Sequence, residues 1–332
     1  MAKRLMVTAP RQVEFKEIPV PDCPGDGLLV RARVTAVSTG TEIRVYRGIA
    51  VDKEGVFLHT YVPFQFPCEN GYSMVGEVVE VGSEAAGFSV GDRVFVAASH
   101  GQYAAVPAHT AIHLPDTISD EVAVFLSILE VGHIGLRTGK PEPGENVAIM
   151  GGGVIGLSAL AYCRAFGFRT ALIELDRGRL DLAGKMGADL LTSPADEGFS
   201  DSVIEFFDGE GPDLVLEAAS VWPAIETGMQ IARKGGRVVV IARHTDMPAF
   251  SPVGHPYLGK GLALLTSYGH RPDGHRWDRR RSNALTLELL SKKKLLVSPM
   301  ITARFDWQEL PDVYRRMDEG DKGLVGVVIR WS

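Results

Sequence analysis

Residues 147–156 read Val-Ala-Ile-Met-Gly-Gly-Gly-Val-Ile-Gly and place glycines at the spacing G-x-G-x-x-G. An apolar, β-branched run precedes these glycines, and a stretch suited to a helix follows them. A strand that turns directly into a helix points backbone N–H groups and the positive end of the helix dipole at one place. Gly151 would permit the tight turn, Gly153 would let a pyrophosphate approach the backbone, and Gly156 would let helix and strand pack closely. The segment therefore predicts a dinucleotide site.

The second predicted strand of this region, 169–175, adds a carboxylate to the predicted site. Glu174 lies eighteen residues after Gly156, where an acidic side chain accepts hydrogen bonds from the ribose hydroxyls of NAD. Arg177 follows three residues later. NADP therefore remains an alternative cofactor, because a guanidinium suits a 2′-phosphate. The residues expected to contact NAD, or alternatively NADP, are Gly151, Gly153, Val154, Ile155, Gly156, Glu174 and Arg177.

The bulk composition is that of an ordinary globular protein. The chain has 332 residues, of which 45% are hydrophobic and 23% charged, and its formal net charge is −6. A chain of this length is expected to form two domains. No apolar run approaches the ~20 residues of a membrane span, no export signal is recognisable, and no long basic segment suggests nucleic-acid binding. The three cysteines lack C-x-x-C spacing, so we expect a reduced, cytoplasmic protein.

The pattern of the chain changes at about Pro115. Before this point, alternating apolar and polar residues predict strands at 27–36, 76–82 and 92–97, in a β-rich domain. After it, strands and helices alternate, which predicts a doubly wound parallel sheet. The strands expected there are 146–150, 170–175, 189–191, 214–217, 237–242 and 263–267. The expected helices are 120–138, 154–166, 177–186, 199–207, 222–233 and 282–291, with a helix at 307–319 and a strand at 323–331 closing the chain.

Four segments resemble the motifs of one protein family. Residues 39–48 (Thr-Gly-Thr-Glu-Ile-Arg-Val-Tyr-Arg-Gly) resemble C-G-T-D-x-x-x-Y-x-G, and residues 71–83 resemble G-H-E-x-x-G-x-V-x-x-V-G. Residues 91–94, Gly-Asp-Arg-Val, match a strand entry, and residues 213–219 are similar to D-x-V-x-E-x-x-G. Together they resemble the medium-chain dehydrogenase/reductase family over essentially the whole chain. The resemblance implies an α/β protein with a GroES-like β-rich catalytic domain and a Rossmann domain.

The resemblance also implies domain limits and further cofactor contacts. The Rossmann domain is expected at 118–267, and the catalytic domain at 1–117 and 268–332. The further residues assigned to the cofactor site are Glu217, Ala218 and Ala242. The short apolar segment 261–267 is expected to be an edge strand of the sheet. Because an unpaired edge invites pairing with its copy, we expect a homodimer.

The departures from the family pattern concern its zinc ligands. Thr39 stands where the family has a cysteine ligand, Tyr72 stands where it has a histidine, and Ser127 aligns with the third ligand. Zinc is held by thiolate, imidazole or carboxylate groups, and the family lobe with four closely spaced cysteines is also missing. We therefore expect no bound metal. Residues 38–42 and 67–73 are similar to a zinc-lacking branch that includes bacteriochlorophyllide dehydrogenase.

Without zinc, another group must move the hydroxyl proton and stabilise charge on the substrate oxygen. The resemblance places Tyr72 at a ligand position, Thr41 at a proton-relay position, and Glu130 and His133 on one helix face near the nicotinamide. These four residues are the catalytic candidates. Each has a structural alternative. Tyr72 would only fill the vacated metal cavity, and Thr41 would only hydrogen-bond the backbone. Glu130 would only form a salt bridge, and His133 would only be an interface residue. Glu42 is expected to pair with an arginine.

The expected function is that of a zinc-independent, nicotinamide-dependent oxidoreductase that interconverts a secondary alcohol and a ketone. Its substrate is expected to be a small molecule, and the sequence carries no motif for a particular one. The first alternative is an NADPH-dependent enone or quinone reductase of the same family. The second alternative is a nucleotide-binding protein without catalytic activity.

Overall fold

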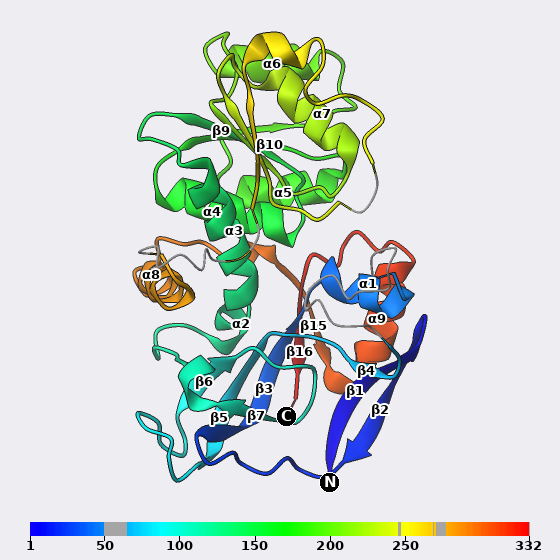
Figure 1. Cartoon of the computed structure of the whole chain (residues 1–332), viewed down its shortest axis with the longest axis vertical. Coiled ribbons are helices and arrows are strands. Elements are labelled where there is room, and N and C mark those ends of the chain that lie inside the picture. Colours follow the sequence, from blue (N-terminus) through cyan, green and yellow to red (C-terminus); the bar gives the residue numbers. More distant parts are fainter. Residues whose placement is uncertain (50–64, 245–246, 268, 270–276, 332) are drawn as a thin grey trace. The chain divides into compact units, whose positions relative to one another are not determined.

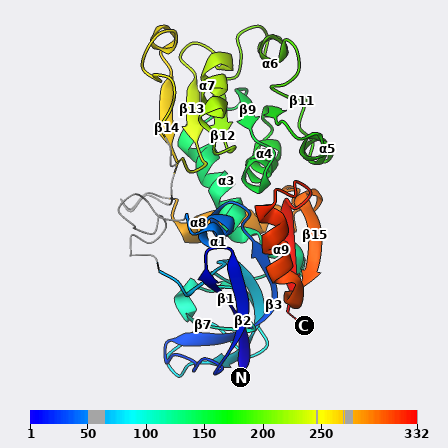
Figure 2. The same ribbon diagram turned by 90° about the vertical axis from the view of Figure 1, so that its right-hand side faces the viewer.

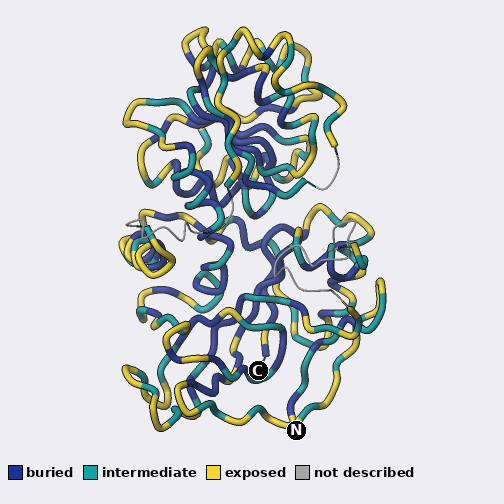
Figure 3. The backbone as a smooth tube through the Cα atoms, in the orientation of Figure 1, coloured by how far each residue is buried: buried dark blue, intermediate teal, exposed yellow. Residues whose placement is uncertain are grey.

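The computed structural model describes residues 1–49, 65–244, 247–267, 269 and 277–331 and folds them into two compact units (Figure 1). The first unit comprises Met1–Ser127 and Ile301–Ser332, and the second comprises Ile128–Met300. Buried backbone is concentrated along the strands of both units (Figure 3). Within the described part of the chain, no helix combines the length and apolar character that crossing a membrane requires.

The first unit is β-rich, as expected, and is built around its longest strand. Strand β3, Gly27–Val37, pairs antiparallel with β5, β7 and β16, and nine of its eleven residues are buried. The larger sheet has the order β15-β16-β3-β5-β6-β8 with β7 also on β3, and a smaller sheet has the order β2-β1-β4. The other strands are β1 (Ala2–Ala9), β2 (Gln12–Ile18), β4 (Cys68–Glu69), β5 (Met74–Val81), β6 (Arg93–Val96), β7 (Tyr103–Pro107), β8 (Ile112–His113), β15 (Ile301–Asp306) and β16 (Gly326–Arg330).

Two helices from opposite ends of the chain lie side by side in the first unit (Figures 1 and 2). Helix α1, Thr41–Arg47, and helix α9, Leu310–Asp318, bury apolar faces in one core with the larger sheet. The buried residues of α9 fall at positions 310, 313, 314 and 317, the spacing of a helix with one apolar face. The remaining helical segments of this unit are η1 (Ala108–Thr110), α2 (Asp120–Ala123) and η4 (Trp307–Glu309).

The second unit is a Rossmann fold, which confirms the expected fold class. Its six strands run parallel in the order β11-β10-β9-β12-β13-β14, and α6 and α7 share an apolar core with them. The strands are β9 (Asn146–Met150), β10 (Arg169–Ile173), β11 (Leu190–Thr192), β12 (Leu214–Glu217), β13 (Arg237–Val240) and β14 (Ala263–Thr266). The helical segments are α3 (Leu126–Gly139), α4 (Val154–Ala165), α5 (Arg177–Lys185), α6 (Phe199–Phe206), α7 (Trp222–Ile231), η2 (Tyr257–Lys260), α8 (Arg279–Ser291) and η3 (Ser298–Met300).

The unit boundaries differ from the expected limits of 118 and 267. Helix α8, which we expected in the catalytic domain, belongs to the second unit. It is joined to α4 by a buried 2.7 Å hydrogen bond between the hydroxyls of Tyr162 and Thr286. The single helix expected at 120–138 is also divided into α2 and α3.

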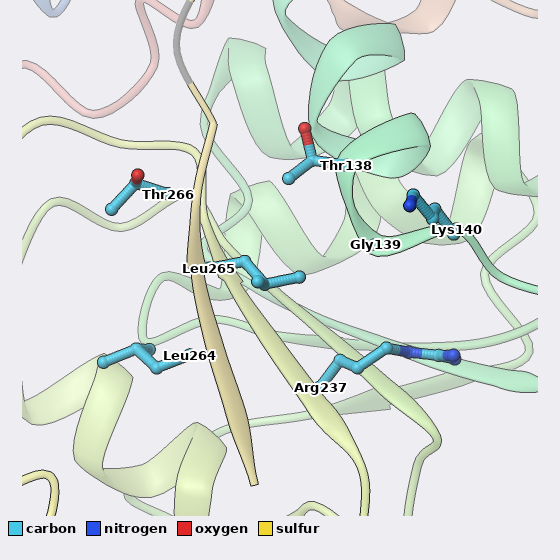
Figure 4. A pocket seen from close by; sticks show the side chains of 7 residues that line it. All are labelled: Thr138, Gly139, Lys140, Arg237, Leu264, Leu265 and Thr266. Carbon is cyan, nitrogen blue, oxygen red and sulfur yellow. The ribbon is translucent and has the colours of Figure 1, made fainter.

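The last strand of the second unit, β14, pairs with β13 on one side only among the described residues. A groove of about 470 Å³ lies beside it (Figure 4). The residues that line this groove are Thr138, Gly139, Lys140, Arg237, Leu264, Leu265 and Thr266. Leu264 is 40% exposed although it is apolar. The predicted edge strand is therefore present with an open side.

Candidate active site

The glycine-rich turn has the backbone geometry that its spacing predicts. Strand β9 ends at Met150, and Gly153 is the N-cap of α4. Gly151 has a φ of +99°, a conformation that residues other than glycine rarely adopt. A Cβ at Gly156 would lie 1.9 Å from the carbonyl oxygen of Gly151, so only glycine fits there. A Cβ at Gly153 would have no heavy atom within 4 Å, which leaves open space at the helix N-terminus.

The carboxylate of Glu174 lies directly against this turn. One of its oxygens, Oε2, accepts a 2.7 Å hydrogen bond from the backbone N–H of Gly152. The other, Oε1, accepts hydrogen bonds from the N–H groups of Leu175 and Asp176. A carboxylate offers about four acceptor positions, so capacity for a ribose hydroxyl remains. The guanidinium of Arg177 is exposed and bonds the carboxylate of Asp196.

Glu217 ends strand β12 next to the same turn, with its carboxylate fully buried. Its Oε1 accepts 2.7 Å hydrogen bonds from the N–H groups of Ala219 and Ser220, and its Oε2 contacts His244 Nε2 at 2.8 Å. The backbone N–H groups of Ala218 and Ala242 also bond within the sheet, to Met150 and Glu217. The side chain of Glu217 therefore shapes the loop after β12. The sequence prediction missed His244.

In the first unit, the hydroxyl groups of Tyr72, Ser38 and Thr41 come together. The phenol donates a 2.7 Å hydrogen bond to the hydroxyl of Ser38, and the hydroxyl of Thr41, at the start of α1, also hydrogen-bonds the phenol. Burial raises the pKa of Tyr72 to about 12, and the charge of Glu42 adds to this, while the two hydrogen bonds act in the opposite direction. The phenol therefore keeps its proton at neutral pH and can donate it in a hydrogen bond. The structure thus brings Thr41 and Tyr72 together, as predicted, and adds Ser38.

The residues at the family's zinc-ligand positions do not fit a catalytic zinc ion. The three positions are held by Thr39, Tyr72 and Ser127, and the Ser127 hydroxyl lies 3.5 Å from the carbonyl oxygen of Tyr72. None of these side chains is a thiolate, an imidazole or a carboxylate, the groups that zinc prefers. Across the residues that the structure describes, no group of three or more His, Cys, Asp or Glu side chains could hold a metal ion.

Glu130 and His133 occupy helix α3 and make contacts within the second unit. Glu130, which is 8% exposed, accepts a 3.0 Å hydrogen bond from Nε of Arg279. The ring of His133 lies 5.0 Å from the ring of Tyr162 and 5.6 Å from that of Trp277. These contacts favour the structural alternatives for both residues, and a catalytic role for Glu130 or His133 stays a prediction.

The prediction that Glu42 pairs with an arginine is wrong. The carboxylate of Glu42 is 1% exposed and accepts hydrogen bonds from the Ser38 N–H at 2.7 Å, from His100 Nε2 at 2.8 Å and from the Tyr314 hydroxyl. A buried carboxylate needs donors on both oxygens. The Ser38 N–H serves Oε1, and a histidine and a tyrosine from distant segments serve Oε2. Sequence reasoning missed these partners because residues 42, 100 and 314 carry no common spacing.

Comparison with known proteins agrees with this architecture. Residues 25–116 match the model of the alcohol dehydrogenase GroES-like domain, and residues 154–278 match that of the zinc-binding dehydrogenase domain. L-threonine 3-dehydrogenase of Pectobacterium carotovorum is 28% identical over 347 residues, which span 95% of this chain and 94% of that protein.

Two solved structures share the whole fold. An alcohol dehydrogenase of Escherichia coli CFT073, complexed with NADH, has a TM-score of 0.83 at 19% identity and covers 99% of both chains. A dehydrogenase of Sinorhizobium meliloti 1021, bound to NADP, has a TM-score of 0.84 at 21% identity and covers 100% of this chain and 99% of its own. The narrower resemblance to the bacteriochlorophyllide dehydrogenase branch stays a prediction. The two domain matches and the shared motifs show that the chain belongs to the medium-chain dehydrogenase/reductase family of NAD(P)-dependent oxidoreductases.

Proposed function

We propose that this protein interconverts a small secondary alcohol and a ketone by hydride transfer, with NAD(H) and without zinc. The observation that carries the proposal is the hydroxyl cluster of Tyr72, Ser38 and Thr41, which replaces the metal-ligand chemistry of the family. A neutral phenol in this place can donate to an oxygen on which negative charge develops. Among the described residues, no group of three or more His, Cys, Asp or Glu side chains could hold a metal ion.

The residues that would hold the cofactor are the glycine turn and the carboxylate beside it. Backbone N–H groups at the start of α4 would bind the pyrophosphate, with Gly153 leaving the space for it. When bound, the nicotinamide ring supplies or accepts the hydride. Glu174 favours NAD over NADP, because its charge would repel a 2′-phosphate. Arg177 supports the same choice, since Asp196 already pairs with its guanidinium.

The side chains of the first unit would handle the oxygen and its proton. In ketone reduction, the Tyr72 O–H would turn from Ser38 to the substrate oxygen. It would donate to this oxygen while a hydride reaches the carbonyl carbon, and it would finally transfer its proton there. The hydroxyls of Ser38 and Thr41 would then donate to the phenol oxygen and stabilise the charge left on it. Because the pKa of an alkoxide exceeds that of the phenol, this proton transfer is downhill. Alcohol oxidation follows the same steps in reverse.

The test is a turnover screen followed at the nicotinamide absorbance band. Secondary alcohols and ketones, L-threonine among them, are compared with conjugated enones, using each of the two cofactors. We expect turnover of a carbinol or ketone with NAD(H). Turnover confined to enones with NADPH would point to the first alternative, and cofactor binding without any turnover would point to the second. Elemental analysis of chelator-free protein completes the test, since about one zinc per chain would overturn zinc independence.

We further propose that the protein is a homodimer and that it works in the cytoplasm. The open edge of β14 and the exposed Leu264 would pair with their copies in a second chain. Light scattering at micromolar concentration should give twice the chain mass, and Leu264→Glu should reduce it. A monomer mass for the unmodified protein would contradict the dimer. Cys23, Cys68 and Cys163 are free thiols, which suits a reducing compartment.

A further inference from the structure

A buried acid–histidine pair lies behind the hydroxyl cluster in the first unit. Glu42 is 1% exposed and His100 is not exposed at all. Their side chains meet at 2.8 Å, between Oε2 of Glu42 and Nε2 of His100. Because a carboxylate oxygen can only accept, His100 Nε2 donates in this contact. Both groups lie outside the proposed proton path, so their presence in the core needs its own explanation.

The pair makes further hydrogen bonds to two other side chains of the unit, Tyr314 and Thr35. The Tyr314 hydroxyl on α9 donates to Glu42, and burial raises the pKa of Tyr314 well above its ordinary value, so it keeps the proton it donates. The other ring nitrogen of His100, Nδ1, lies 2.7 Å from the hydroxyl of Thr35, which also accepts from the indole N–H of Trp331. The pair is therefore held rigidly from several sides.

The same pair fixes the residue that accepts the hydrogen bond of Tyr72. The backbone N–H of Ser38 donates to Glu42 Oε1 at 2.7 Å, and the backbone N–H of Glu42 donates to the Ser38 carbonyl at 3.1 Å. Ser38 and Glu42 are thus joined twice, once through a carboxylate and once through the backbone. These two bonds hold the Ser38 backbone, from which the hydroxyl that accepts from the phenol of Tyr72 extends.

The pair also fixes the loop that carries Tyr72 itself. The side-chain amide of Asn70 donates to the backbone carbonyl of Glu42 at 3.1 Å. The backbone N–H of His100 donates to the backbone carbonyl of Asn70 at 2.9 Å. Gly71 has a φ of +95°, and a Cβ there would lie 2.6 Å from Cδ2 of His100. The imidazole ring therefore lies directly under the backbone that leads into Tyr72.

From these contacts we infer that Glu42 and His100 form a positioning pair, which holds both ends of the Tyr72–Ser38 hydrogen bond and so sets how Tyr72 meets the substrate oxygen. The inference rests on the proposed function for its effect on turnover. It differs from a purely structural role for the pair, which would affect folding but would leave the phenol and its chemistry unchanged in any variant that folds.

The first experiment measures the phenol in the protein without substrate. Tyrosine is labelled with ¹³C at Cζ, and the Tyr72 resonance is identified as the one that Tyr72→Phe removes. We expect this resonance to move by more than its line width in Glu42→Gln and in His100→Gln. It should stay in place in the matched control Glu69→Gln, whose exposed carboxylate pairs with Arg4. An unmoved resonance in the folded variants overturns the inference.

A milder variant covers the case in which these substitutions prevent folding. Tyr314→Phe removes one donor to Glu42 but keeps the acid and the histidine in place. The same resonance is measured in this variant, with the same two outcomes. A shift of Tyr72 supports the positioning pair, and an unmoved resonance overturns it.

The second experiment measures turnover of the best ketone from the screen with NADH. We expect Glu42→Gln and His100→Gln to lower kcat about tenfold while the Kd for NADH changes less than about twofold. In a Tyr72→Phe background the same substitutions should lower kcat no further, because their effect passes through Tyr72. An equal loss in both backgrounds overturns the inference. Normal turnover of Tyr72→Phe contradicts the proposed function instead, and the Tyr72 resonance then decides on the pair alone.

Discussion

The two units build their candidate sites from different materials. In the second unit the site is mainly backbone, formed by ten consecutive residues and one carboxylate that bonds Gly152. In the first unit the site is made of side chains, and the groups that position them come from residues 35, 38, 42, 100, 314 and 331. The first kind of site depends on the absence of side chains, and the second depends on their presence in several distant segments.

This difference determines how each site responds to substitution. A backbone site fails when a single Cβ enters space that the turn or the ligand needs. A side-chain site should lose function gradually, as individual hydrogen bonds are removed from a network that otherwise stays in place. The predictions below test whether the two units really differ in this way.

The largest effect is expected at Gly156. A Cβ there would meet the Gly151 carbonyl oxygen at 1.9 Å, so Gly156→Ala must displace helix or strand, at a cost of roughly 3 kcal/mol of unfolding free energy. NADH binding should become unmeasurable by fluorescence titration. Gly153→Ala should fold normally yet weaken NADH binding, and the control Gly259→Ala, which has open space, should change neither. Tight NADH binding by Gly156→Ala would show that the backbone site tolerates a Cβ, and would contradict the difference between the two units.

The next effect is expected at Tyr72. Removing its hydroxyl should lower kcat about 100-fold, roughly the 3 kcal/mol of an oxyanion donor, while the affinity for NADH hardly changes. Steady-state kinetics with a secondary alcohol and its ketone provide the measurement. Tyr103→Phe, a tyrosine on β7 outside both sites, is the matched control. If Tyr72→Phe turned over normally, Tyr72 would only fill the vacated metal cavity.

A smaller effect concerns stability at high pH. Since burial raises the pKa of Tyr72 to about 12, the folded chain holds this proton at pH values where the unfolded chain has lost it. The contribution of Tyr72 to the free energy of unfolding is fully present below about pH 10. It falls by about 2 kcal/mol as the pH rises from about 10 to 12. Denaturant unfolding at several pH values measures it, as the difference between the protein and Tyr72→Phe. A difference independent of pH would show that the phenol is not held as described.

The smallest effect is expected in the choice of cofactor. The negative charge of Glu174 should weaken NADPH binding relative to NADH by about 10-fold, or roughly 1.4 kcal/mol. Glu174→Gln should narrow this ratio, and Arg177→Ala should leave it unchanged because Asp196 holds that guanidinium. Fluorescence titration with both nucleotides gives the ratio. If the unmodified protein bound NADPH more tightly than NADH, the prediction would be wrong, and Arg177 would be the candidate ligand of the 2′-phosphate.

Much of the second unit could be predicted from local sequence. The strands at 146–150 and 214–217, the turn at Gly151 and the placement of Glu174 beside it all follow from patterns that span fewer than thirty residues. The errors arose where tertiary packing decides. Helix α8 was expected in the catalytic domain, yet the Tyr162–Thr286 hydrogen bond joins it to α4.

The first unit could be predicted only in part. Its β-rich character and the neighbourhood of Thr41 and Tyr72 followed from the motifs, but Ser38, His100 and Tyr314 did not. We expected Glu42 to pair with an arginine, because a lone buried acid most simply pairs with a cation. The structure supplies the donors from a histidine, a tyrosine and a backbone N–H instead.

The sequence by itself determined the fold class, the family and the glycine turn, because hydrophobic periodicity and glycine spacing act through the local backbone. Tertiary structure alone decided which polar side chains meet, since the partners of Glu42 lie 58 and 272 residues away along the chain. A buried carboxylate must be satisfied wherever the fold can bring donors to it. The positions of those donors are set by the packing of β3, α1 and α9 in one core, which no local pattern records.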